Sequence, residues 1–139
     1  IEAVYISHLH ADHIGGLEWF GSSRKFQDNC ILPKIYIHKD LYTPLWENSL
    51  SGGMASLETE KATLESYFNV YKVDLHFVWE GITFELVKVK HVVNFDVQQP
   101  CYALFCRQGQ RCDASPRHES LLPLKTTFST SPCRYGLEV

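Results

Sequence analysis

Several features that mark other classes of protein are absent from this sequence of 139 residues. It has no apolar run that approaches the ~20 residues of a membrane-spanning helix, so we expect no membrane partner. It has no dense tract of lysine and arginine and a formal net charge of −3, so its charge does not indicate a nucleic-acid partner. The only methionine is Met54, so Ile1 is not expected to be a natural translation start, and we expect the chain to be a fragment.

Cysteine motifs are missing as well. The five cysteines are an odd number and none forms a Cys-x-x-Cys pair, which is typical of a reducing compartment and not of a disulfide framework. We therefore expect a cytoplasmic location. With 45% hydrophobic and 21% charged residues, the composition is that of one globular domain.

Hydrophobic patterning predicts two short buried strands near the N-terminus. Residues 3–7 form a β-branched and aromatic run that ends at a polar cluster, and residues 34–38 form a second such run. Between them, the pair Gly15-Gly16 introduces an apolar segment that we interpret as a short helix ending near residues 21–23. The sequence therefore predicts strands that alternate with helices.

Two further helices are predicted in the middle of the chain. Asp40 is a suitable N-cap for the first of them, and the pair Gly52-Gly53 is expected to end it. Residues 55–68 place apolar side chains near one face and most charges elsewhere, which predicts an amphipathic helix.

The pattern changes to a period of two from Val70 onward, which predicts paired strands. The pair Glu80-Gly81 is expected to form a tight turn between two of these strands. Further along, the apolar positions shift from even-numbered to odd-numbered residues. This shift predicts a bulge that changes the direction in which His91 points at the end of its strand. Residues 102–106 predict a further strand.

A dense cluster of metal-binding residue types directly follows the first predicted strand. His8 and His10 are two positions apart, so in an extended segment both side chains point the same way and can bind one cation. If a helix then begins, Asp12 and His13 turn toward the same cavity and can bind a second ion. Imidazole nitrogens and a carboxylate suit Zn²⁺, with Mn²⁺ and Fe²⁺ as competitors.

This motif resembles the signature of the metallo-β-lactamase superfamily of metallohydrolases. The resemblance is carried by residues 6–18, Ile-Ser-His-Leu-His-Ala-Asp-His-Ile-Gly-Gly-Leu-Glu. It implies an α/β fold in the form of a partial αββα sandwich, a mixed sheet with helices on its outer face, truncated at both ends. It also implies zinc as the cofactor, with two ions in an intact site.

The resemblance assigns roles to five residues. His8 and His10 would bind the first metal ion, and Asp12 and His13 the second. His91, which follows an extended apolar stretch, is the candidate for the third histidine of the first site. Asp12 would also be the catalytic residue, since it would orient the attacking hydroxide.

The sequence departs from the family pattern after its last predicted strand. The family next presents an aspartate that bridges both ions and then a final histidine, and Asp113 and His118 are poor matches because no strand pattern leads to them. We therefore assign residues 1–111 to a partial metallo-β-lactamase domain. Residues 112–139 are interpreted as an atypical tail, either disordered or the product of a shifted reading frame.

The predicted function is that of a metal-dependent hydrolase acting on an ester, phosphodiester or amide with a metal-activated hydroxide. The segment Trp46 to Leu50 and the predicted helical insert after it look more like the ribonuclease Z and phosphodiesterase-like branch than like secreted lactamases. The substrate would be a small molecule or a phosphodiester. The alternative is a truncated, non-catalytic metal-binding fragment. An uncovered sheet face or edge would also make a homodimer possible.

Overall fold

The computed structural model describes residues 1–28, 31–58, 60–91, 93–94 and 97–106. Its first sheet is parallel and contains three strands in the order β1-β2-β3. These strands are β1 (Ala3–Ile6), β2 (Lys34–His38) and β3 (Asn69–Val73). The first two were predicted from the sequence, and the third belongs to the segment in which a period of two was recognised.

A second sheet is antiparallel and follows in the order β4-β5-β8. It contains β4 (His76–Trp79), β5 (Ile82–Val89) and β8 (Cys101–Cys106). Glu80 and Gly81 connect β4 to β5 with φ angles of 54° and 74°, the left-handed conformation that a two-residue hairpin turn requires. Beyond this sheet, β6 (Val93–Asn94) and β7 (Val97–Gln98) pair in the antiparallel direction.

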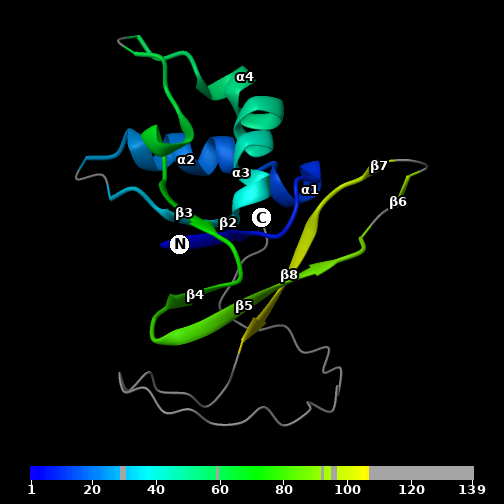
Figure 1. Ribbon diagram of the computed structural model, residues 1–139. Coiled ribbons are helices and arrows are strands. Elements are labelled where there is room, and N and C mark those ends of the chain that lie inside the picture. The colour runs from blue at the N-terminus through cyan, green and yellow to red at the C-terminus, as the bar shows by residue number, and fades with distance from the viewer. Residues whose placement is uncertain (29–30, 59, 92, 95–96, 107–139) are drawn as a thin grey trace, which may run out of the picture.

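Helices cover one face of the parallel sheet, and the second sheet lies on its other side (Figure 1). The helices are α1 (Ala11–Ile14), α2 (Leu17–Lys25), α3 (Lys39–Leu45), the π-helix η1 (Trp46–Leu50), α4 (Ser51–Met54) and the 3-10 helix η2 (Leu64–Ser66). The predicted α/β class is therefore confirmed. No helix in the described ranges has the length and apolar character needed to cross a membrane.

Aromatic side chains hold the two sheets together. Tyr5, Tyr36 and Tyr71 lie side by side on neighbouring strands of the parallel sheet. The Tyr36 ring stacks on Phe77 of β4 at 4.2 Å between centroids, and Phe77 stacks on Phe84 of β5 at 5.2 Å. Successive strand residues alternate between faces, so the intervening aliphatic residues belong to the helix-covered core.

The predicted helix at residues 55–68 is wrong. A bridge between Ser56 and Lys61 and the short η2 take up part of this segment. Its apolar residues Leu64 and Phe68 are nevertheless fully buried. The Tyr67 hydroxyl donates a hydrogen bond to the Met54 carbonyl at 2.8 Å. These tertiary contacts stabilise an irregular backbone conformation in this segment, although the spacing of its apolar residues is also compatible with a helix.

The predicted helix boundaries also need correction. The helical path that begins at Lys39 continues through η1 and α4 to Met54, so the pair Gly52-Gly53 does not end it. The N-cap is His38 and not Asp40, because His38 Nδ1 accepts the hydrogen bond from the Asp40 amide. Likewise, α2 runs beyond residues 21–23 to Lys25.

The predicted bulge is absent from the strand pair β5 and β8. These strands pair without interruption as far as Val89 opposite Cys101. Further along, residues 90–92 separate β5 from β6, whereas only residues 99–100 separate β7 from β8. The stretch between β5 and β6 is therefore one residue longer than the stretch between β7 and β8. The extra residue lies near His91 and not within β5.

Gly21 allows α2 to pack closely on the core. A Cβ atom at this position would lie 2.8 Å from Phe68 Cζ and 3.2 Å from Met54 Cε. Alanine favours a helix over glycine by about 1 kcal/mol, whereas overpacking a core costs about 1–3 kcal/mol. We therefore expect Gly21→Ala to lower the free energy of unfolding by about 1 kcal/mol in chemical denaturation.

The matched control is Gly52→Ala in α4, because a Cβ atom there would meet nothing within 4 Å. This variant is expected to keep the free energy of unfolding or raise it by up to about 1 kcal/mol. A Gly21→Ala variant as stable as Gly52→Ala would contradict the close packing between α2 and Phe68.

Candidate metal centre

Three histidines from two separate parts of the chain come together at one end of the molecule. His8, His10 and His91 each offer a ring nitrogen, and these nitrogens all lie within 4.8 Å of one another. The ring centroid of His8 lies 4.3 Å from that of His91 and 4.8 Å from that of His10. This donor set and spacing could hold a metal ion, and it contains the three residues predicted for the first site.

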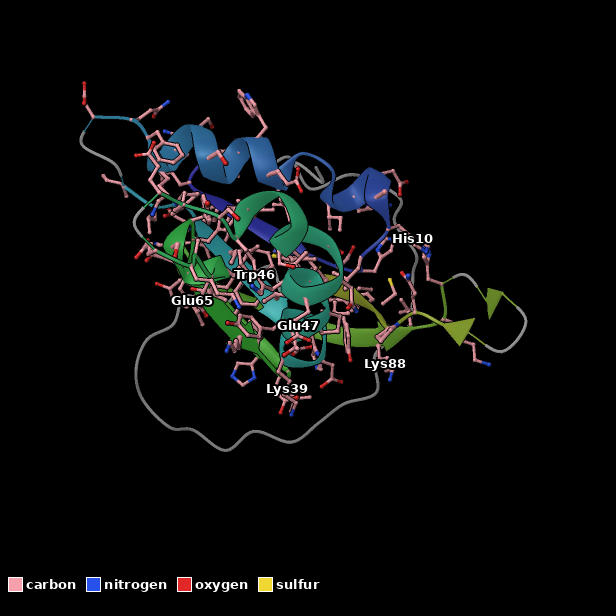
Figure 2. The ribbon with its side chains drawn as sticks, turned by 90° about the horizontal axis from the view of Figure 1, so that it is seen from above. His10, Lys39, Trp46, Glu47, Glu65 and Lys88 are labelled. Atoms are coloured by element: carbon pink, nitrogen blue, oxygen red, sulfur yellow. The ribbon has the colours of Figure 1, made fainter. Side chains whose placement is uncertain are left out.

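The first two histidines owe their positions to the segment between β1 and α1. β1 ends at Ile6, and α1 begins at Ala11. His10 is the N-cap of α1, with the extended backbone angles φ −70° and ψ 145°. Figure 2 shows His10 where the chain enters α1. The predicted order of an extended segment followed by a helical turn is therefore confirmed.

His91 reaches the cluster from the second sheet. It follows the end of β5 at Val89, in the stretch that carries one residue more than the opposing strand. Its ring centroid lies 5.1 Å from that of His10. The candidate centre therefore bridges the parallel and the antiparallel sheet.

His8 is the buried member of the cluster, with 3% of its surface exposed. Its Nδ1 lies 2.9 Å from the Ser7 hydroxyl oxygen. Its Nε2 is buried and has no hydrogen-bond partner among the described residues. Buried polar atoms are normally paired, and leaving one unpaired costs about 1–3 kcal/mol. A metal ion at Nε2 would satisfy this atom, so the residues fit the metal that the motif implies.

The surroundings of His8 favour its neutral form. Burial first, and then the nearby imidazoles of His13, His91 and His10, together lower the pKa of its ring to about 4. The ring is therefore neutral near pH 7. A neutral imidazole is the form that binds a metal ion, so no proton has to leave His8 for binding at this pH.

Of the two residues predicted to bind a second ion, His13 adjoins the histidine cluster and Asp12 is exposed. The His13 ring centroid lies 4.1 Å from that of His8, so His13 adjoins the cluster. The Asp12 side chain is 80% exposed, and its carboxylate lies 3.5 Å from His13 Nε2. Their role as ligands of a second ion stays a prediction. Asp113 and His118 lie outside the described residues.

A second polar cluster was not predicted from the sequence. His38, at the end of β2, is 5% exposed and stacks on the Tyr102 ring at 3.7 Å. The Tyr102 hydroxyl donates to the Asp40 carboxylate at 3.0 Å, and His38 Nε2 lies 3.6 Å from the Asp74 carboxylate. Burial and the bond to Asp40 raise the pKa of Tyr102 to about 12. The Lys39 ammonium lies 2.7 Å from the Asp74 carboxylate of this cluster, and Figure 2 shows Lys39 apart from His10.

The second cluster is linked to the first through the backbone. The Tyr102 amide donates a hydrogen bond to the Ser7 carbonyl at 2.9 Å, and the Tyr5 hydroxyl donates to the Tyr102 carbonyl at 2.8 Å. The segment that carries His8 is therefore fastened to β8. The sequence did contain one indication of this cluster. His38 lies at the end of a predicted strand, and Asp40 follows it two residues later.

Comparison with known proteins identifies the family. The profile described as "Anti-Pycsar protein Apyc1" matches residues 1–125. The chain belongs to the Apyc1 family. Among Apyc1 relatives, the protein of Paenibacillus harenae is 39% identical over 128 residues, which are 90% of this chain and 50% of that protein. The protein of Paenibacillus xerothermodurans is 34% identical over 97 residues, 68% of this chain and 38% of that protein.

Apyc1 proteins of phages are similar to this chain as well. That of Bacillus phage vB_BsuM-Goe3 is 36% identical over 70 residues, which are 50% of this chain and 27% of the phage protein. The chain thus spans half or less of the length of these Apyc1 relatives. Among solved structures, unliganded yeast PDE1 matches with a TM-score of 0.56 and 21% identity, over 76% of this chain and 30% of that chain. This likeness concerns the fold alone.

Removal of single histidines tests the metal centre. We expect His8→Ala, His10→Ala and His91→Ala each to weaken Zn²⁺ binding by about 100-fold or more, since loss of an outer partner of a ligand alone costs about 10- to 100-fold. Competition with a chromogenic chelator measures the dissociation constants.

The control for these variants is His76→Ala, which removes an exposed histidine from β4. It should bind zinc as the unaltered protein does. Equal zinc affinity in His76→Ala and His91→Ala would exclude His91 from the metal centre.

Proposed function

We propose that this chain is the metal-binding part of a phosphodiesterase with the metallo-β-lactamase fold that hydrolyses cyclic nucleotides. The observation that carries the proposal is the buried, unpartnered Nε2 of His8 in a cluster with His10 and His91. Anti-Pycsar proteins degrade cyclic nucleotides, and the family assignment supports the same reaction class here. The helix layer and the two facing sheets agree with part of an αββα sandwich.

His8, His10 and His91 would hold one metal ion, and Asp12 and His13 a second. Zinc suits this donor set, with manganese or iron as alternatives. When bound, the metal supplies Lewis acidity and lowers the pKa of water at the site. The exposed carboxylate of Asp12 would orient the attacking water and hold its proton. Water would add to the phosphorus atom, one ring P–O bond would break, and the proton taken from the water would pass to the departing ribose oxygen, giving a linear nucleotide monophosphate.

The charge of the chain favours a small phosphodiester over a polymeric one. A cyclic mononucleotide carries a single negative charge, whereas a nucleic acid presents many phosphates that require a basic surface. The chain has a net charge of −3 and no dense basic tract. A small anionic substrate in the cytoplasm therefore agrees with both the sequence and the family.

The second candidate function is a non-catalytic metal-binding fragment. The chain spans half or less of the relatives compared above, and a bridging aspartate and a final histidine are not found in the described residues. We propose residues 1–111 as the metallohydrolase part and residues 112–139 as a separate tail, and a homodimer stays a proposal. Metal binding without turnover would favour this second candidate.

Hydrolysis assays test the leading proposal. With Zn²⁺ or Mn²⁺ present, the protein is expected to convert cyclic nucleotides to linear monophosphates and to lose this activity with a chelator. We expect Asp12→Asn to lower kcat by about 100-fold or more, as removal of a group that positions a proton does, while His8, His10 and His91 still bind zinc. Chromatography of the nucleotides measures the rate.

Asp28→Asn is the matched control. Asp28 is an exposed aspartate that lies three residues after the end of α2, outside the candidate metal centre. It should retain full activity. Turnover of linear RNA without turnover of cyclic nucleotides would contradict the proposed substrate class, and chelator-resistant turnover would contradict the metal requirement.

A further inference from the structure

Ser7 is the residue immediately before the histidine cluster, directly after β1. Its hydroxyl oxygen lies 2.9 Å from His8 Nδ1. The opposite ring nitrogen of His8, Nε2, is buried and unpartnered within the described part of the chain. The two nitrogens of one ring therefore have different surroundings, a hydroxyl on one side and a metal-binding cluster on the other.

This difference selects one tautomer of the His8 ring. A neutral imidazole carries a hydrogen on one nitrogen and a lone pair on the other. With the hydrogen on Nδ1, the ring donates to Ser7 Oγ and leaves the lone pair on Nε2. With the hydrogen on Nε2, a buried N–H would point into the cluster with no acceptor, and no lone pair would be available for a metal.

We propose that Ser7 is a positioning residue whose hydroxyl accepts a hydrogen bond from His8 Nδ1 and thereby presents the Nε2 lone pair to the metal. The proposal rests on the metal centre of the proposed function and adds a residue to it. Ser7 does not touch the substrate. A hydroxyl orients the ring without adding negative charge beside the metal, unlike the carboxylates that often support metal-binding histidines.

The backbone that carries the Ser7 side chain is held by a hydrogen bond from β8. The Ser7 carbonyl accepts a hydrogen bond from the amide of Tyr102, which is 4% exposed. Tyr102 is held in turn through its ring on His38 and through its hydroxyl on Asp40. Through Tyr102, the second polar cluster is thus linked to the residue that orients His8.

Zinc affinity and NMR test the proposal. We expect Ser7→Ala to weaken Zn²⁺ binding by about 10-fold or more, and Ser7→Thr, which keeps the hydroxyl, to bind zinc nearly as the unaltered protein does. The nitrogen-15 shifts of His8 in the metal-free protein at pH 8 should show the hydrogen on Nδ1. In Ser7→Ala the two tautomers should mix.

Ser23→Ala is the matched control, because the Ser23 hydroxyl donates a comparable hydrogen bond to the Phe20 carbonyl within α2. It should bind zinc normally. Any one of three results overturns the proposal: unchanged zinc affinity in Ser7→Ala, a loss in Ser7→Thr or Ser23→Ala equal to that in Ser7→Ala, or a hydrogen on Nε2 of His8 in the unaltered metal-free protein.

These measurements use Zn²⁺ and no substrate, so they separate the role of Ser7 from the proposed reaction. An active enzyme whose zinc affinity is unaffected by Ser7→Ala overturns the role of Ser7 alone. If Ser7→Ala weakens zinc binding as expected but the protein hydrolyses no cyclic nucleotide, the proposed function alone is overturned. A protein that binds none of Zn²⁺, Mn²⁺ and Fe²⁺ overturns both.

Discussion

The burial of one imidazole nitrogen without a partner in the described residues is the constraint on which the candidate site depends. His8 cannot relieve it by taking up a proton near neutral pH, because burial and the neighbouring imidazoles lower its pKa to about 4. It cannot turn to water either, because the side chain is almost fully enclosed. A metal ion shared with His10 and His91 relieves the constraint and uses the electron pair that the burial leaves unused.

The fold brings these ligands together by packing two sheets. His8 and His10 follow a strand of the parallel sheet, whereas His91 follows a strand of the antiparallel one. The aromatic contacts of Tyr36, Phe77 and Phe84 hold the sheets in this relation. A metal bound by all three histidines would therefore link the two sheets, and its binding energy would add to the stability of their packing.

Local patterns predicted the parts of this structure that depend on local sequence. The spacing of His8 and His10 after a strand, the turn at Glu80-Gly81 and the strand before His91 follow from short-range geometry. The helix at residues 55–68 failed because apolar spacing does not distinguish a helix from an irregular segment held by contacts such as that of Tyr67 with Met54.

Long-range contacts were beyond the reach of sequence patterns. A serine beside a histidine has no distinctive spacing, so the role of Ser7 became visible only when the orphaned nitrogen of His8 was located. The stacking of His38 on Tyr102 likewise joins residues far apart in the chain. The extra residue beside His91 is found by comparing the register of the pair β5 and β8 with that of the pair β6 and β7. The alternation of apolar residues within β5 predicted a bulge several residues earlier in the chain.

The most direct test of the account is a crystal of the zinc-loaded protein measured at the zinc absorption edge. The account predicts an anomalous peak about 2.0–2.1 Å from Nε2 of His8, the usual zinc–nitrogen distance, with ring nitrogens of His10 and His91 bound to the same ion. A crystal with zinc elsewhere and Nε2 of His8 still unpartnered would contradict it.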